Sequence, residues 1–287
     1  MNPSSTNSNT NENLENSGIV QNMNLNKDVQ DVFAFENEYK KIGETAGEYV
    51  PVTKLISAAD VATIGNACVG LLSILYALNK NFTISVSLIL FAMALDSLDG
   101  ALARKFGSRH SFGGHLDSIS DTVSFCFAPA VLLYAAYYDA TVNQPYLNRL
   151  LVVTMGSVVI LGAVRLAWFA HIRGGKLDYF KGLNTPLMSL MIVSTYLTFP
   201  ENIPPAVLLI VFLLSLCMVI AIKFPKIRGA LIIPTGAMVA ILLFSTLFFR
   251  NSPWFFIAPV ISLAGVALYI IVGPFYVRHE LGKKQRG

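Results

Sequence analysis

The chain has 287 residues, of which 54% are hydrophobic and 13% are charged, and its mean hydropathy is +0.58. A soluble globular chain carries about 25% charged residues, so this composition excludes a disordered chain and a disulfide scaffold, argues against an ordinary soluble domain and favours several membrane spans. The first 60 residues hold nine acidic and four basic side chains, whereas the rest hold eight and seventeen. We expect membrane lipid around the protein and no nucleic-acid partner.

The N-terminal region is polar. Residues 1–30 are rich in Asn and poor in apolar side chains, so we expect a disordered cytosolic tail. They lack the basic start and apolar core of a signal peptide. Residues 31–58 mix aromatic residues with Lys and Glu, which is compatible with an interfacial amphipathic helix and equally with a plain linker.

Apolar segments follow one another along the rest of the chain. They cover approximately residues 61–79, 82–103, 115–138, 149–171, 183–199, 204–222, 229–248 and 253–276. Each is close to the ~20 residues that a helix needs to cross a bilayer, and none shows the period of two of a barrel strand. The sequence therefore predicts an all-α polytopic membrane bundle of about eight transmembrane helices.

The positions of Lys and Arg predict the orientation. The connections on one side, together with the C-terminal tail, hold thirteen of them, and the opposite connections hold three. Cytosolic loops carry the excess of basic residues. Both termini, and the aspartates described next, are therefore expected to face the cytosol. The sequence leaves open whether the membrane is the plasma membrane or the endoplasmic reticulum.

Four aspartates, Asp96, Asp99, Asp117 and Asp121, lie where the second apolar segment ends and the third begins. The members of each pair are three and four residues apart, so each pair shares a helix face. If these two segments pack as an antiparallel pair, both acid pairs meet at the cytosolic edge. Carboxylates beside a membrane helix are costly and need a partner or a water-filled cavity, which marks a functional site.

This cluster predicts a metal site. Four converging carboxylates suit hard cations such as Mg²⁺, Mn²⁺ or Ca²⁺, and four acids are enough for two of them. Small residues beside the acids, Gly100 and Ala103, would let a bulky ligand approach the backbone. Arg104, one turn further, has a guanidinium suited to phosphate. A phosphate-bearing ligand is therefore expected next to the metals.

The segment LDSLDGALARKFGSRHSFGGHLDSISD resembles the signature of the CDP-alcohol phosphotransferase family, D-x2-D-G-x2-A-R-x8-G-x3-D-x3-D. Its eight fixed positions are filled by Asp96, Asp99, Gly100, Ala103, Arg104, Gly113, Asp117 and Asp121. The resemblance implies a catalytic six-helix core at 59–228. Residues 229–287 would then add two transmembrane helices and a basic cytosolic tail.

The resemblance also implies an activity. Such enzymes move a phosphatidyl-type group from a CDP-linked lipid to an alcohol and release CMP. By this analogy Asp96, Asp99, Asp117 and Asp121 would hold two divalent cations, Mg²⁺ or Mn²⁺, and Asp121 would also be the general base. The CDP-lipid would contact Asn66, Asp96, Gly100, Ala103, Arg104 and Gly113. A homodimer is expected on the same ground.

Three further segments indicate which alcohol is the acceptor. LDSISDTVSFCFAPA, VRLAWF and YFKGLNTP resemble elements of the phosphatidylserine and archaetidylserine synthases, which implies L-serine as acceptor and CDP-diacylglycerol or CDP-archaeol as donor. Cys126 stands where glycine is usual, and Trp168 where a second arginine is usual. Arg165 is retained, and it is expected to bind the serine carboxylate or a lipid phosphate, or else to extend to the interface.

Two alternatives stay open. The same chemistry with another alcohol, such as glycerol phosphate or inositol phosphate, differs only in the acceptor pocket. A cation transporter that uses the aspartates as an ion path belongs to a different class. Transporters place their sites near the midplane and often show repeated helices. Here the acids lie at one edge and no repeat is apparent.

Overall fold

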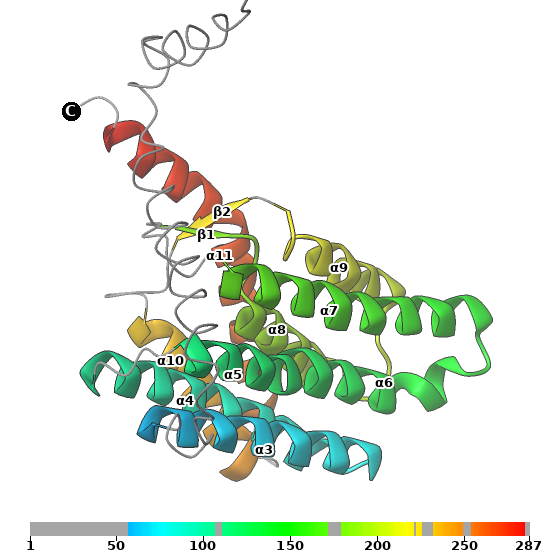
Figure 1. The fold of residues 1–287 in the computed structure, drawn as a ribbon. Coiled ribbons are helices and arrows are strands. Elements are labelled where there is room, and N and C mark those ends of the chain that lie inside the picture. Colours follow the sequence, from blue (N-terminus) through cyan, green and yellow to red (C-terminus); the bar gives the residue numbers. More distant parts are fainter. Residues whose placement is uncertain are drawn as a thin grey trace, which may run out of the picture. The chain divides into compact units, whose positions relative to one another are not determined.

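The apolar segments of the sequence correspond to the helices of the computed structural model (Figure 1), which describes residues 57–106, 111–171, 179–220, 222–225, 232–248 and 254–284. Single helices are α3 (Ala58–Leu78), α4 (Phe82–Phe106), α7 (Pro145–His171), α8 (Thr185–Thr198), α9 (Pro205–Leu216), α10 (Ile232–Phe248) and α11 (Trp254–Lys284). The third segment is α5 (Ser111–Asp121), the π-helix η2 (Thr122–Phe127) and α6 (Ala128–Thr141) in succession. The predicted tail 1–30 lies outside the described residues, as does nearly all of 31–58.

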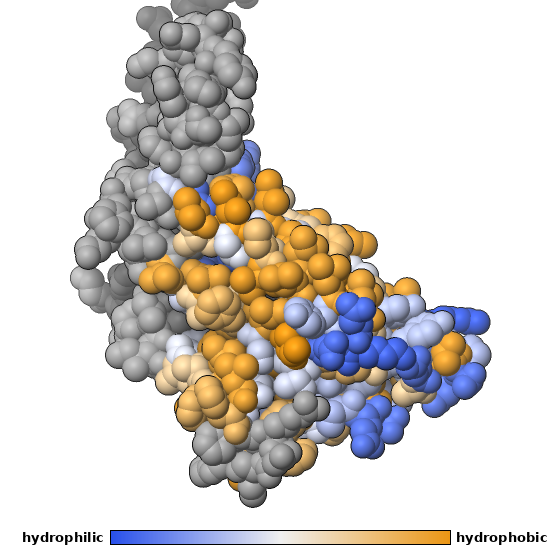
Figure 2. All heavy atoms as spheres, turned by 90° about the horizontal axis from the view of Figure 1, so that it is seen from below, coloured by the Kyte–Doolittle hydropathy of each residue, from blue (hydrophilic) through white to orange (hydrophobic). Residues whose placement is uncertain are grey.

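The described helices form an all-α membrane bundle, as predicted. Four are long and apolar enough to cross a bilayer: Asp60–Leu78, Gly113–Thr141, Pro145–His171 and Phe255–Arg278. The apolar parts described for α4, α8, α9 and α10 are shorter. Figure 2 shows apolar residues over much of one face and hydrophilic residues gathered toward one end. An apolar exterior of this kind suits a lipid environment.

Local signals explain several helix starts. The Ser57 side chain accepts a hydrogen bond from the Asp60 amide, and the Asp60 carboxylate accepts from the Ser57 amide at 2.7 Å. This reciprocal capping box fixes the first turn of α3. Helices α8 and α9 carry Pro186 and Pro205 in the first turn, where the missing N–H costs nothing.

Helix α8 is the most enclosed helix of the bundle. All residues from Leu187 to Leu197 are buried, which is unusual for a membrane helix that faces lipid on one side. The C-terminal helix α11 packs against it, and Ser194 Oγ donates to Ser262 Oγ at 2.9 Å. Helices α4 and α6 also contact α8. The C-terminal helices therefore form part of the bundle interior.

A short two-stranded sheet, which the sequence analysis did not predict, joins two connections. β1 (Tyr179–Lys181) follows α7 in the chain and pairs antiparallel with β2 (Lys223–Pro225), with Phe180 opposite Phe224. The sixth span was expected to continue to residue 222, but α9 ends at Leu216 because the chain turns there to reach β2. The strands bring the ends of α7 and α9 together.

Candidate active site

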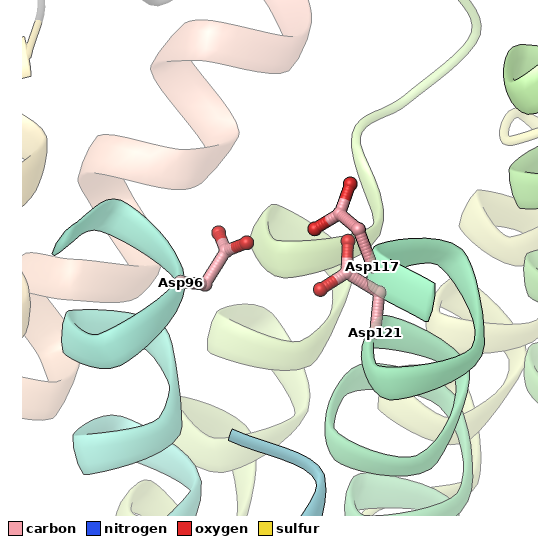
Figure 3. Close-up of side chains that lie close together, drawn as sticks. All are labelled: Asp96, Asp117 and Asp121. Carbon is pink, nitrogen blue, oxygen red and sulfur yellow. The ribbon is translucent and has the colours of Figure 1, made fainter. Parts of the chain in front are cut away.

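Three of the four aspartates meet in the structure. Asp96 of α4 lies opposite Asp117 and Asp121 of α5, and one carboxylate oxygen from each lies within 4.8 Å of the others (Figure 3). Asp96 and Asp117 are half-buried, and Asp121 is 9% exposed. The side chain of Asp99, on the same helix as Asp96, is outside the described residues.

Helix α3 holds the two acid-bearing helices in place. It packs against both α4 and α5, whereas α4 and α5 have few close contacts with each other among the described residues. The acids of α4 and α5 therefore meet because both helices pack against α3, and not because the two helices pack closely on each other. Asp96 on α4 thus comes within reach of Asp117 and Asp121 on α5, with α3 packed against both helices.

Hydroxyl groups fasten α5 and η2 to α3. Ser120 Oγ donates to the Thr63 carbonyl at 2.8 Å, and Ser124 Oγ donates to the Asn66 carbonyl at 2.9 Å. Gly70 of α3 lies directly against Ser124, where a Cβ would clash with the hydroxyl. Buried hydrogen bonds of this kind fix the rotation of one helix relative to another. Asp117 and Asp121 therefore have a defined direction.

Asp60 is a residue of this region that the sequence analysis missed. Its side chain is 6% exposed, and its Oδ1 lies 2.6 Å from where a Cβ on Gly113 would be. Gly113 precedes Asp117 by one helical turn. The absence of a side chain at Gly113 makes room for Asp60, and the predicted contact of Gly113 with the CDP-lipid stays a prediction. The spacing Ser57-x-x-Asp60 was the available sequence signal.

Asn66 of α3 contacts Asp121. It is fully buried, and its Nδ2 donates to Asp121 Oδ1 over a long 3.5 Å. Its Oδ1 has no hydrogen-bond partner among the described residues. A buried amide oxygen without a donor is costly, so this position fits an additional ligand at the site. The hydrogen bond also orients the Asp121 carboxylate.

Arg165 is held within the protein. It is 4% exposed, its Nη1 donates to Thr185 Oγ1 at 2.9 Å, and its guanidinium lies 5.9 Å from the centre of the Phe169 ring. It is close enough to Asp121 to interact electrostatically. Among the described residues its Nε finds no acceptor. Thr185, the last residue but one of the YFKGLNTP element, is a partner that sequence analysis did not identify.

The two departures from the subfamily pattern differ in their surroundings. Cys126 is fully buried in η2, and a Cβ on Gly162 of α7 would lie 2.5 Å from its Sγ. The larger residue on one helix is thus matched by the absence of a side chain on the other. Trp168 is 39% exposed on α7. The Trp168 side chain is therefore much more exposed than that of Arg165.

The remaining predicted contacts lie on the last turns of α4. Gly100 is half-buried there, whereas the side chains of Ala103 and Arg104 are outside the described residues. All three are in the helix that carries Asp96. Their predicted contacts with a CDP-lipid stay a prediction.

The donor set at the aspartates fits a hard divalent cation. Carboxylate oxygens within 4.8 Å of one another repel strongly in a region of low dielectric constant. Bringing a cation between them removes that repulsion, and hard cations prefer oxygen ligands. The geometry thus supports a metal site formed by Asp96, Asp117 and Asp121.

Known proteins are similar to this chain over the helices that carry the aspartates. A profile of the CDP-alcohol phosphatidyltransferase family matches residues 56–224. Archaetidylserine synthase of Methanothermobacter thermautotrophicus is 36% identical over 182 residues, 62% of this chain and 73% of that protein. CDP-diacylglycerol–serine O-phosphatidyltransferases of Methanocaldococcus jannaschii and Bacillus subtilis are 37% identical over 177 residues and 36% over 167. These two alignments cover 61% and 58% of this chain, and 77% and 88% of those proteins.

The matched region contains every aspartate of the cluster and ends at β2, so α10 and α11 lie beyond it. Because the profile covers more than half of the sequence, the chain belongs to the CDP-alcohol phosphatidyltransferase family.

Proposed function

We propose that this protein transfers a phosphatidyl or archaetidyl group from a CDP-linked lipid to the hydroxyl of L-serine and releases CMP. The observation that carries the proposal is the meeting of Asp96, Asp117 and Asp121 at a membrane helix bundle, on the family's signature residues. The names of three relatives, which are serine transferases or an archaetidylserine synthase, support serine as the acceptor.

In the proposed reaction the serine hydroxyl oxygen attacks the lipid-side phosphorus of the CDP-lipid. The bond from that phosphorus to the bridging oxygen breaks, and CMP leaves with the electron pair. Asp121 takes the hydroxyl proton as general base, while Asn66 orients its carboxylate. Its partly enclosed position, 9% exposed, suits a base that must be kept from bulk water.

Asp96, Asp99 and Asp117, together with Asp121, would hold two divalent cations, Mg²⁺ or Mn²⁺. When bound, these cations would neutralise the pyrophosphate and stabilise the departing CMP. Gly100, Ala103 and Arg104, on the turns after Asp96, would receive the CDP group together with Gly113 of α5. Asn66 Oδ1, which has no donor among the described residues, is a further contact for the bound ligand.

Arg165 would bind the serine carboxylate. Its side chain is enclosed, it lies within electrostatic range of Asp121, and its Nε lacks an acceptor in the described part of the chain. A guanidinium with an unused donor suits a carboxylate ligand. Cys126 and Trp168 depart from the serine-enzyme pattern, and on that ground another alcohol acceptor is kept as the second candidate.

The orientation and the assembly belong to the same proposal. The excess of Lys and Arg in one set of connections supports a cytosolic location for both termini and for the aspartates. A homodimer is proposed by analogy with the family.

The test is a CMP-release assay with purified protein, CDP-diacylglycerol or CDP-archaeol, and a panel of acceptors that includes L-serine, glycerol phosphate and inositol phosphate. Serine should give the fastest release, a chelator should stop it, and Mg²⁺ or Mn²⁺ should restore it. Asp139→Asn, which alters an exposed acid paired with Lys80, serves as a control and should keep full activity. If CMP is released with another alcohol but not with serine, the serine assignment is wrong.

A further inference from the structure

The C-terminal helix α11 lies outside the family-matched region, yet it fixes strand β2. The Tyr269 hydroxyl donates to the Pro225 carbonyl at 2.8 Å, and its ring stacks on Phe224 with centroids 5.8 Å apart and an angle of 13° between the planes. One turn further, a Cβ on Gly273 would lie 3.0 Å from Pro225 Cδ. Helix α11 therefore contacts β2 over two successive turns, at a buried aromatic residue.

Strand β2 in turn determines the path of the chain after β1. Phe224 is paired with Phe180, and the Gly182 amide donates to the Ile222 carbonyl at 2.8 Å. Gly182 has φ +77° and lies directly against the Met218 carbonyl, so only glycine fits there. The Leu183 amide donates to the Cys217 carbonyl at 3.0 Å. These contacts attach the connection between β1 and α8 to the residues that join α9 to β2.

That connection ends at the partner of Arg165. Thr185, the first residue of α8, is fully buried and accepts the hydrogen bond from Arg165 Nη1. A chain of contacts therefore leads from Tyr269 to Arg165 through the two strands and Thr185.

We propose that Tyr269 is a positioning residue for the acceptor side of the active site, so that the C-terminal helix, beyond the family core, helps to set the geometry of Arg165. This rests on the proposed role of Arg165 in binding the acceptor. It predicts that α11 affects the affinity for the acceptor and leaves the CDP-lipid and metal side unchanged.

The test compares Tyr269→Phe with Tyr276→Phe in the full-length protein. Tyr269→Phe removes the hydrogen bond to Pro225 and keeps the stacking ring. Tyr276 is on the same helix but is 57% exposed, so its variant controls for the loss of a hydroxyl. We expect Tyr269→Phe to raise the acceptor KM about two- to tenfold, the effect of one neutral hydrogen bond, with kcat and the CDP-lipid KM within twofold of wild type. Tyr276→Phe should change none of them.

A double variant shows whether Tyr269 acts through Arg165. If it does, Arg165→Ala with Tyr269→Phe should have the acceptor KM of Arg165→Ala alone, because the two effects share one route. Independent, multiplied effects would overturn the proposal, as would an unchanged acceptor KM or a parallel rise in the CDP-lipid KM. For all of these variants, the acceptor KM is measured with the alcohol that the wild-type protein uses best in the panel. A failure of the serine assignment is therefore seen in wild type, before any variant is compared.

Discussion

Asp121 differs from the other two acids of the cluster in its surroundings. It is the most enclosed of the three, it accepts a hydrogen bond from Asn66, and it lies within electrostatic range of Arg165. Asp117 and Asp96 lie further from the enclosed interior. This difference suits a division of roles in which Asp121 serves both the acceptor and the metals, and the other two acids serve the metals alone.

The Asp121→Asn variant separates a base from a ligand. The amide nitrogen cannot take the acceptor proton, so transfer should fall about 10²–10⁴-fold while the CDP-lipid KM changes little. Asp117→Asn is the comparison, because loss of a charged ligand should abolish CMP release and weaken metal binding together. Steady-state kinetics over a range of Mg²⁺ concentrations measures both. If Asp121→Asn loses CDP-lipid affinity as severely as Asp117→Asn, then Asp121 is chiefly a metal ligand.

Arg165→Ala addresses the acceptor side. Removing the guanidinium should raise the serine KM far more than the CDP-lipid KM, because a charged hydrogen bond to the carboxylate is lost. Initial rates at varied serine and at varied CDP-lipid give the two constants. An unchanged serine KM, or a rise in the lipid KM alone, would assign the carboxylate to another residue.

At the scale of elements, η2 lies between α3 and α7 and contacts both. Ser124 donates to α3, and Cys126 two residues later faces Gly162 of α7. A π-helix has a wider turn than an α-helix and often occurs at functional sites. Here it follows Asp121 directly, so the geometry at this acid depends on both neighbouring helices.

The contact between η2 and α7 predicts a pair of compensating substitutions. Gly162→Ala places a Cβ against Cys126 Sγ and should destabilise the protein by about 1–3 kcal/mol, the usual cost of overpacking. Adding Cys126→Gly, which restores the usual subfamily residue, should recover most of that loss. Thermal unfolding in detergent measures both, with Gly156→Ala as control, since a Cβ there meets nothing within 4 Å. Additive losses would show that the two positions are not coupled.

At the scale of the whole molecule, the C-terminal helices complete a core that the family-matched region leaves open. Helix α11 covers α8 and bonds to it between Ser194 and Ser262, and α10 packs on α4, where Ser87 donates to Thr246 at 3.3 Å. Removing these helices would take away the partner of the Ser194 hydroxyl on α8, whereas Ser87 on α4 would keep its hydrogen bond to the Thr83 carbonyl. Polar groups without partners in lipid are costly.

A truncation after residue 228 tests this dependence. We expect the shortened protein to insert but to unfold at a clearly lower temperature than the full chain, since α8 loses one covered face. A chain that ends at Lys284 is the control and should match wild type, because it loses only the last three residues. Unfolding at the full-chain temperature would mean that α10 and α11 add nothing to the core.

The sequence alone determined the helices and the chemistry of the aspartates. Long apolar runs predict membrane helices because a spanning segment must satisfy its backbone internally, and each predicted run has its helix. The spacing within each pair, Asp96 with Asp99 and Asp117 with Asp121, indicated a shared helix face because residues three or four apart lie on the same side of a helix. These are local properties, set by neighbours within a few residues.

The tertiary structure decided what depends on residues far apart in the chain. It packed α3 against both α4 and α5, placed Asp60 against Gly113 and Cys126 against Gly162, and paired β1 with β2. Each of these contacts joins residues at least 36 positions apart or depends on a third helix, so no local pattern records it. The connection of Tyr269 to Arg165 is of the same kind: it passes through two strands of three residues, which are too short to be recognised by periodicity and exist only because the bundle brings their ends together.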